Sequence, residues 1–167
     1  IAFVQSYGSA STGFCMNTSN TNSGGWKNSH MMKTICPAFL NALPSAWRNA
    51  IKNCTKYSDN TGGGNDTASY VTATTQKIFL LAEFEVHGTR YYANSAEKNY
   101  QKQYDYYKNG NSKVKYQHSS TGSACIWWLR SVRASSTTTF CHVGADGGAS
   151  STNAYFSRGF APGFKAA

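Results

Sequence analysis

The chain has 167 residues, 40% hydrophobic and 14% aromatic, with a net charge of +9, which is the size of one ordinary domain with enough apolar mass for a buried core. Its apolar runs fall short of the roughly 18 residues of a membrane span, and its first residues lack the basic flank and long apolar core of a signal peptide. Composition thus predicts one soluble domain over residues 1–167, either alone or at the C-terminal end of a longer protein, and disfavours a membrane-inserted one.

Two short helices are expected after a polar, glycine-containing loop over residues 16–32. In the segment "SHMMKTICPAFLNAL", four apolar residues recur at helical spacing: Met31, Met32, Ile35 and Phe39. Pro44 then suits the first turn of a second helix, "PSAWRNAIKNC". On that helix one face would carry Trp47, Ile51 and Cys54.

The rest of the chain is typical of β-structure and loops. "SDNTGGGNDT" (residues 58–67) is expected to be a loop tip, followed by strands in "SYVTATT" and in "KIFLLAEFEVHG", the latter apolar enough for a central strand. "ACIWWLRS" predicts another buried strand, and "TTFCHV" alternates as a strand does. The fold class is therefore α+β, with two short helices on a small, mostly antiparallel sheet and long irregular loops. The predicted core includes Trp127, Trp128, Leu129, Phe79 and Leu81.

Basic and aromatic residues alternate in "EKNYQKQYDYYKNGNSKVKYQH". The lysines are Lys98, Lys102, Lys108, Lys113 and Lys115, and the tyrosines are Tyr100, Tyr104, Tyr106, Tyr107 and Tyr116. A groove for single-stranded nucleic acid uses cations for phosphates and rings for stacking. A solvated loop or strand pair whose lysines lie along apolar surface fits equally well. Since no known binding motif surrounds the segment, a nucleic-acid partner is the less favoured alternative.

Candidates for catalysis or metal binding are few. Glu83 and Glu85 lie two apart on one face of the expected strand, where a paired acid and base is conceivable but a structural role is commoner. Asp146 lies in a turn. The four histidines have no ligand spacing: His30, His87, His118 and His142. Five cysteines lack a C-x-x-C pair and predict buried thiols: Cys15, Cys36, Cys54, Cys125 and Cys141. The sequence therefore predicts no enzyme activity, no cofactor and no metal.

The segment "SVRASSTTTFCHVGADGGASSTNAYFSRGFAPGF" (residues 131–164) contains no Lys, Glu, Gln, Met or Trp. Twenty-six residues of these five types occur in the other 133 positions, so six or seven would be expected among these 34. A polar Ser/Thr/Gly tract of low complexity is the simplest explanation. It does not explain why these particular five types are missing.

The motifs "GGWKNSHMM", "LPSAW", "KIFLLAEFEV", "ACIWWLRS" and "GFAPGF", in this order, resemble a domain of unknown function from gut bacteria and their phages. Some members resemble variable proteins of diversity-generating retroelements. The resemblance implies a C-type-lectin-like fold, shared with the phage major tropism determinant, and a diversified C-terminal tract. In such systems adenines of the template are copied with errors, and an Asn codon ending in a pyrimidine then never yields Lys, Glu, Gln, Met or Trp. That set is the one missing here.

On this interpretation, fixed scaffold positions alternate with variable ones over about 133–158, and most of the variable side chains are expected to lie exposed on one contiguous face. Residues 127–131 are scaffold, as are Phe140, Cys141, Val143, Asp146, Gly147, Ala149 and Ala154. The candidate variable positions are Arg133, Ser136, Thr138, Thr139, His142, Gly144, Ala145, Gly148, Ser150, Ser151, Thr152, Asn153, Tyr155, Phe156 and Arg158.

The function that the resemblance implies is recognition of a protein or other surface ligand, from a virion or a bacterial cell surface. Small polar residues with a few aromatic and Arg side chains compose the candidate positions, as in an antibody paratope. The E-P-N, Q-P-D and W-N-D motifs of calcium-dependent sugar sites are absent, so a lectin-like fold implies no sugar binding here. The alternative function is a basic module for nucleic acid or another polyanion, built on residues 98–118.

Overall fold

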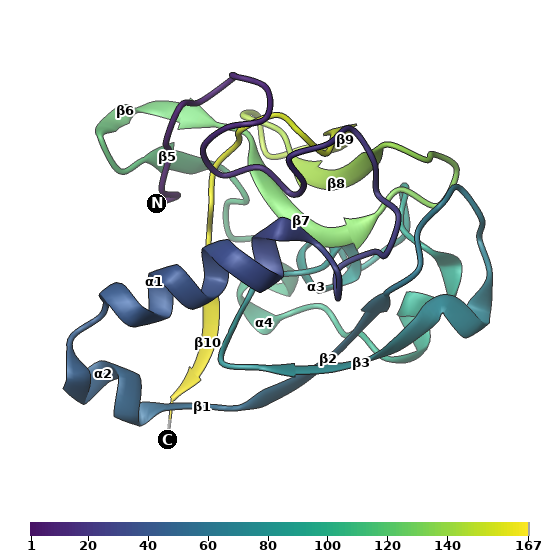
Figure 1. Cartoon of the computed structure of the whole chain (residues 1–167), viewed down its shortest axis with the longest axis horizontal. Coiled ribbons are helices and arrows are strands. Elements are labelled where there is room, and N and C mark those ends of the chain that lie inside the picture. Colours follow the sequence, from purple (N-terminus) through teal and green to yellow (C-terminus); the bar gives the residue numbers. More distant parts are fainter. Residues whose placement is uncertain (167) are drawn as a thin grey trace.

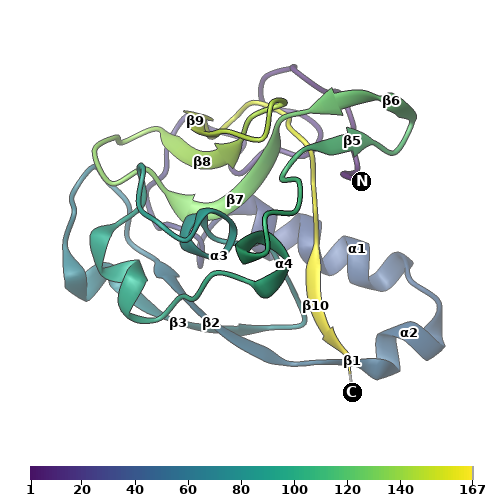
Figure 2. The same ribbon diagram turned by 180° about the vertical axis from the view of Figure 1, so that it is seen from behind.

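The computed structural model describes residues 1–166, in which short helices surround several small antiparallel sheets (Figures 1 and 2). The helices are α1 (Cys36–Ala42), α2 (Ser45–Ala50), α3 (Glu83–His87) and α4 (Asp105–Lys108). The strands are β1 (Ile51–Lys52), β2 (Cys54–Asp59), β3 (Val71–Gln76), β4 (Ile78–Phe79), β5 (Lys115–Gln117), β6 (Ser120–Cys125), β7 (Trp127–Val132), β8 (Thr139–Val143), β9 (Ala149–Asn153) and β10 (Gly163–Ala166). The predicted α+β class is confirmed.

The sheet β7-β8-β9 lies between two apolar clusters. Alternate residues of a strand point to opposite faces of a sheet, so Trp128 and Phe140 enter one cluster while Trp127 and Cys141 enter the other. All six residues of β7 are buried. β9 pairs with β8 alone and forms the outer edge. A buried two-sided strand therefore supports a partly exposed edge strand.

The first helix forms where the apolar spacing predicts it. A π-helical turn (Met31–Ile35) runs directly into α1, and Met31 and Ile35 are buried beneath it. Met32 and Phe39 are half-buried against the same cluster. The chain before this helix packs along the C-terminal tract, and Phe3 and Phe160 exchange two backbone hydrogen bonds of 2.7 and 2.8 Å.

The second helix is shorter than predicted. α2 ends at Ala50, because Ile51 and Lys52 leave the helix to pair with Ala166 and Lys165 of β10. The predicted face of Trp47, Ile51 and Cys54 does not exist, and the Trp47 side chain is 58% exposed. In Figures 1 and 2 the C-terminus lies beside β1, and the N-terminus lies beside β5.

The predicted central strand over residues 77–88 is wrong. Only Ile78 and Phe79 form a strand, and Glu83–His87 is helical. A fully buried apolar run does not distinguish strand from helix, and two Glu in the first turn followed by a left-handed Gly88 (φ 72°) are features of a helix. Glu83 and Glu85 consequently do not share a strand face.

The other predicted elements fit well. Strands form at β3, β7 and β8, and residues 58–67 form a loop after the first residues complete β2. The strand expected in "TTFCHV" forms as β8, and four of its five residues are buried. Phe79, Trp127, Trp128 and Leu129 are core as predicted, while Leu81 is half-buried between the two clusters. None of the described helices has the length and apolar character needed to traverse a lipid bilayer.

Candidate ligand-binding surface at an edge strand

The candidate variable positions lie on β8, on β9 and on the loops around them. Ala145 and Gly148 are exposed, and twelve positions are half-buried. His142 is the exception, because its side chain is only 5% exposed and packs edge-on against Trp128, with ring centroids 6.2 Å apart. His142 is therefore not among the exposed candidate positions, since its strand is covered on both faces.

The predicted single face is also wrong in its geometry. Ser150 and Thr152 pair with His142 and Phe140, so these side chains lie on one side of β9. Ser151 pairs with Cys141 and therefore lies on the opposite side. All five residues of β9 are nevertheless half-buried, because no further strand covers this edge. The candidate positions thus occupy both sides of one edge strand.

Aromatic and cationic side chains gather just beyond the end of β9. Tyr155 and Phe156 contact each other edge-on, with centroids 4.9 Å apart. The Arg158 guanidinium lies 5.2 Å from the centroid of Phe156 and 5.7 Å from that of Tyr7. Burial, followed by the nearby Arg158 charge, lowers the pKa of His142 to about 4. The imidazole is therefore neutral at neutral pH.

The side of β9 that bears Ser151 is organised around Arg133. Its Nη1 donates to Ser151 Oγ (3.2 Å), and its Nε donates to Ser135 Oγ (3.1 Å). The guanidinium lies 5.1 Å from the centroid of Tyr92. Like Arg158, this cation is placed over an aromatic ring, where the flat guanidinium can stack and still offer donors to a ligand.

Unsatisfied polar atoms are concentrated in this tract. Eight buried side-chain N or O atoms lack a hydrogen-bond partner within residues 1–166, and three of them belong to Thr139, His142 and Arg158. Buried polar atoms in proteins are nearly always paired, so each such atom needs an explanation. The candidate positions therefore carry three of the eight unpaired atoms.

The strand beneath these positions is rigidly held. Trp128 Nε1–H donates to Phe14 O (2.8 Å), and Trp127 Nε1–H donates to Lys113 O (2.9 Å). Both rings are fully buried. The indoles thereby tie β7 to the N-terminal segment on one side and to the loop before β5 on the other.

Comparison with known families places the whole of this arrangement in one domain family. The profile of Domain of unknown function (DUF6273) matches residues 10–165. The chain belongs to this family. No curated protein and no solved structure matches the chain. The DUF6273 match includes the candidate positions, the scaffold strand β7 and the Lys/Tyr segment.

The buried carboxylates of this DUF6273 domain have structural partners. Arg130, fully buried on β7, donates to both oxygens of Glu85 (2.6 and 2.8 Å), and Lys56 Nζ lies 3.2 Å from Glu85 Oε1. Burial alone would raise the pKa of Glu85, but the Arg130 and Lys56 charges outweigh it and lower that pKa. Glu83 accepts backbone N–H groups of the loop at residues 91–93.

Glu97 is a buried acid that sequence analysis did not single out. Its Oε2 accepts from Ser131 Oγ (2.6 Å) and Gln101 Nε2 (2.9 Å), and its Oε1 accepts from the Asp59 N–H (2.9 Å). Burial raises the pKa of Glu97 to about 7, although these hydrogen bonds act in the opposite direction. The sequence offers no signal for this group beyond the scarcity of acids.

The remaining predicted groups are dispersed. Among the described residues, no three His, Cys, Asp or Glu side chains come together as a possible metal site. All five cysteines are free thiols, of which four are buried and Cys54 is half-buried. His118 Nδ1 accepts the Val4 N–H (3.1 Å), and desolvation lowers the pKa of His87 to about 4.

The Lys/Tyr segment is divided between packing and solvent. Tyr107 is buried. Lys115 Nζ lies 4.7 Å from the centroid of the Trp127 ring, and burial lowers the pKa of Lys115. Tyr100 stacks on Tyr57, with centroids 4.5 Å apart and an interplanar angle of 9°. The other exposed tyrosines are Tyr104, Tyr106 and Tyr116. The segment contributes to two different depressions, one lined by Lys98 and Lys102 and the other by Tyr104, Tyr106, Tyr107 and Lys115.

Proposed function

We propose that this domain is a non-enzymatic recognition module that displays retroelement-diversified residues on a C-type-lectin-like scaffold. Its ligand would be a protein or another surface molecule on a cell, and the domain would act from a virion or a bacterial surface. The single observation that carries the proposal is the half-exposed edge strand β9, which bears four candidate positions and rests on the buried strands β7 and β8.

This arrangement supports diversification physically. Side chains on an edge strand can change while the backbone pairing of β9 with β8 is retained. A rigid base limits the conformational entropy lost when a ligand binds. Arg133, Arg158, Tyr155 and Phe156 provide the large planar side chains that commonly contribute most interface energy.

The residue types absent from residues 131–164 support the same proposal. Fourteen of the fifteen candidate positions are at least partly exposed, and the scaffold residues Phe140, Cys141, Val143 and Ala154 are buried. His142 would then be a variable position whose substitution alters packing against Trp128 as well as the binding surface. Short helices, small antiparallel sheets and long loops accord with a C-type-lectin-like scaffold.

The decisive test is to sequence the genome around the gene. A near-copy of the DNA that encodes residues 131–164, with Asn codons ending in a pyrimidine at the candidate positions, should lie beside a reverse transcriptase gene. Differences between copy and gene should fall at these positions and spare residues 127–131. A genome without such a copy, or one whose differences fall at scaffold codons, contradicts diversification of this chain.

A basic surface favours polyanion binding as the second candidate function. A depression of about 560 Å³ is lined by Arg90, Lys98 and Lys102, and by no Asp or Glu among the described residues. Gln101, which also lines it, donates to the backbone of Tyr57 in the exposed Tyr57–Tyr100 stack. Titration with oligo(dT) at increasing salt tests this function. A saturable, salt-sensitive affinity that K98A/K102A removes would support it, whereas an unchanged affinity in that variant would oppose it.

A further inference from the structure

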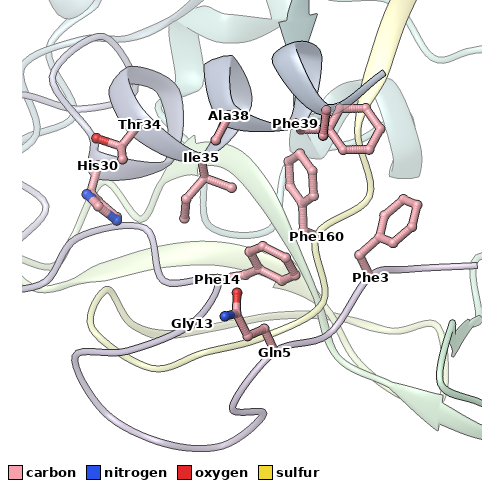
Figure 3. A pocket seen from close by; sticks show the side chains of 11 residues that line it. Phe3, Gln5, Gly13, Phe14, His30, Thr34, Ile35, Ala38, Phe39 and Phe160 are labelled. Carbon is pink, nitrogen blue, oxygen red and sulfur yellow. The ribbon is translucent and has the colours of Figure 1, made fainter. Parts of the chain in front are cut away.

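A pocket of about 470 Å³ opens between the N-terminal segment and α1, separate from the edge strand β9. Its aromatic lining residues are Phe3, Phe14, Phe39 and Phe160, and its polar ones are Gln5, His30 and Thr34. Figure 3 shows His30 and Thr34 at one end and Phe3 and Phe39 at the other. The volume is within the range of small-molecule sites.

The walls of this pocket are preformed. Phe3 and Phe160 are held by their paired backbone hydrogen bonds, and Phe14 is held by the bond from Trp128 Nε1. The rings support one another, with the Phe160 centroid 5.4 Å from that of Phe14 and 5.3 Å from that of Phe39. A ligand therefore needs to order little of the protein when it enters.

The lining chemistry specifies the ligand. The lining contains no Lys, Arg, Asp or Glu, so a charged ligand would lose its hydration without gaining an ionic partner. The rings offer edges and faces to a further aromatic ring. The side chains of Gln5, His30 and Thr34 make no hydrogen bond within residues 1–166, and they are available to a polar group at one end of the ligand.

The surroundings favour a small molecule over a protein partner. Beyond His30 and Thr34 the surface becomes polar, since the adjoining depression is otherwise lined by Asn, Thr, Ser and Lys residues. A stable protein interface needs roughly 800 Å² on each partner, with a connected apolar centre. The apolar wall here belongs to one pocket of about 470 Å³, which is the size of a small-molecule site.

We propose that this pocket binds a small neutral molecule with an aromatic ring and one hydrogen-bonding group. The proposal is independent of the edge-strand function. Its failure would leave that function unaffected, and the reverse also holds.

The test is an NMR titration of the ¹⁵N-labelled domain with 4-methylphenol. The amide signals of Phe14, Ile35 and Phe160 should shift saturably. 4-Methylcyclohexanol, which is of similar size but has a saturated ring in place of the aromatic one, should bind about three- to tenfold more weakly. Benzoate, which carries a charge, should bind at least about tenfold more weakly. Equal affinities for the three probes, or shifts that do not saturate, would overturn the proposal.

Two tryptophan substitutions on α1 locate the binding site. Ala38 is exposed and lines the pocket, so Ala38→Trp should fill it and reduce 4-methylphenol affinity at least about tenfold by steric exclusion. Asn41 is exposed on the same helix outside the lining, so Asn41→Trp should bind as the parent does. If Ala38→Trp lowers the melting temperature of the domain, Ala42→Trp offers a second way to fill the pocket, because Ala42 also lines it. Equal binding by the blocked and control variants contradicts the assignment.

Discussion

Two buried glutamates on neighbouring elements respond to pH in opposite directions. Glu85 is ionised because Arg130 and Lys56 lower its pKa, so its stabilising contribution is present above its unfolded pKa and is lost as the pH falls through the folded value. Glu97 is fully buried and hydrogen-bonded, but it has no salt bridge within residues 1–166. Its pKa is therefore raised, to about 7.

Glu97 should make the domain less stable as the pH rises from about 5 to 8. Because its folded pKa lies above the unfolded value of 4.5, the native state binds the proton more tightly, and this contribution is full below pH 4.5 and lost through pH 7. The difference corresponds to roughly 3 kcal/mol. Urea unfolding at several pH values should show this fall, and Glu97→Gln should remove most of it. A Glu97→Gln domain with the parental pH profile would contradict the assignment.

Removal of one partner of the Arg130–Glu85 pair should lower the free energy of unfolding far more than replacement of both partners by apolar residues. Arg130→Met leaves the Glu85 carboxylate buried with only Lys56 nearby, and should lower the free energy of unfolding by about 3–5 kcal/mol. The double variant Glu85→Leu/Arg130→Met removes both charges, so it should recover much of that loss. Chemical denaturation of the three proteins measures the difference. Equal destabilisation by the single and double variants would show that the charge is not the cause.

At the scale of elements, the tract and the strand beneath it should respond differently to truncation. Tyr155 and Phe156 are half-buried. The Ser11 N–H donates to the backbone carbonyl of Tyr155, so a change of the Tyr155 side chain keeps this hydrogen bond. Replacing both by Ser should leave the melting temperature nearly unchanged, and should weaken binding to a target found by display screening by at least about 2 kcal/mol. Trp128→Ser should instead cost about 3–5 kcal/mol of stability through a core cavity. A double variant that unfolds as readily as Trp128→Ser would place the tract in the core.

The elements show which sequence signals were sufficient. Local signals found α1 and β7, where helical spacing or unbroken apolar density specifies the structure. They failed at Ile51, because this residue leaves the helix to pair with Ala166 of β10, which is far away in the sequence. They did not specify the sides of β9, because these depend on its pairing with β8, which the sequence does not show. The burial of His142 also depends on a contact between strands, because the Trp128 ring on β7 covers its side chain.

At the scale of the whole molecule, the buried side chain of Ser157 joins two parts of the N-terminal segment to the C-terminal tract. Ser157 Oγ accepts the Phe14 N–H (3.0 Å) and donates to the Gln5 carbonyl. Phe14 precedes Ser157 by 143 positions in the chain, and Gln5 precedes it by 152. Gly13 lies at this junction with φ 61°, where a Cβ would overlap the Gln5 carbonyl and Ser157 Oγ. The N-terminal segment, the aromatic pocket and the end of the candidate tract therefore share one anchor. Nothing in the sequence distinguishes Ser157 from the other serines of residues 131–164.

Ser157→Ala should loosen this junction without unfolding the sheet. The Phe14 N–H and the Gln5 carbonyl lose their partner in a partly buried place, which costs about 1 kcal/mol. Amide exchange should accelerate over residues 5–14 and remain slow in β7, whose own bonds are unchanged. Ser9→Ala is the matched control, because Ser9 is exposed and contributes its backbone alone, accepting from the Ser157 N–H (2.8 Å). If exchange in β7 rises as much as in residues 5–14, the serine supports the whole fold and is not a local anchor of the N-terminal segment.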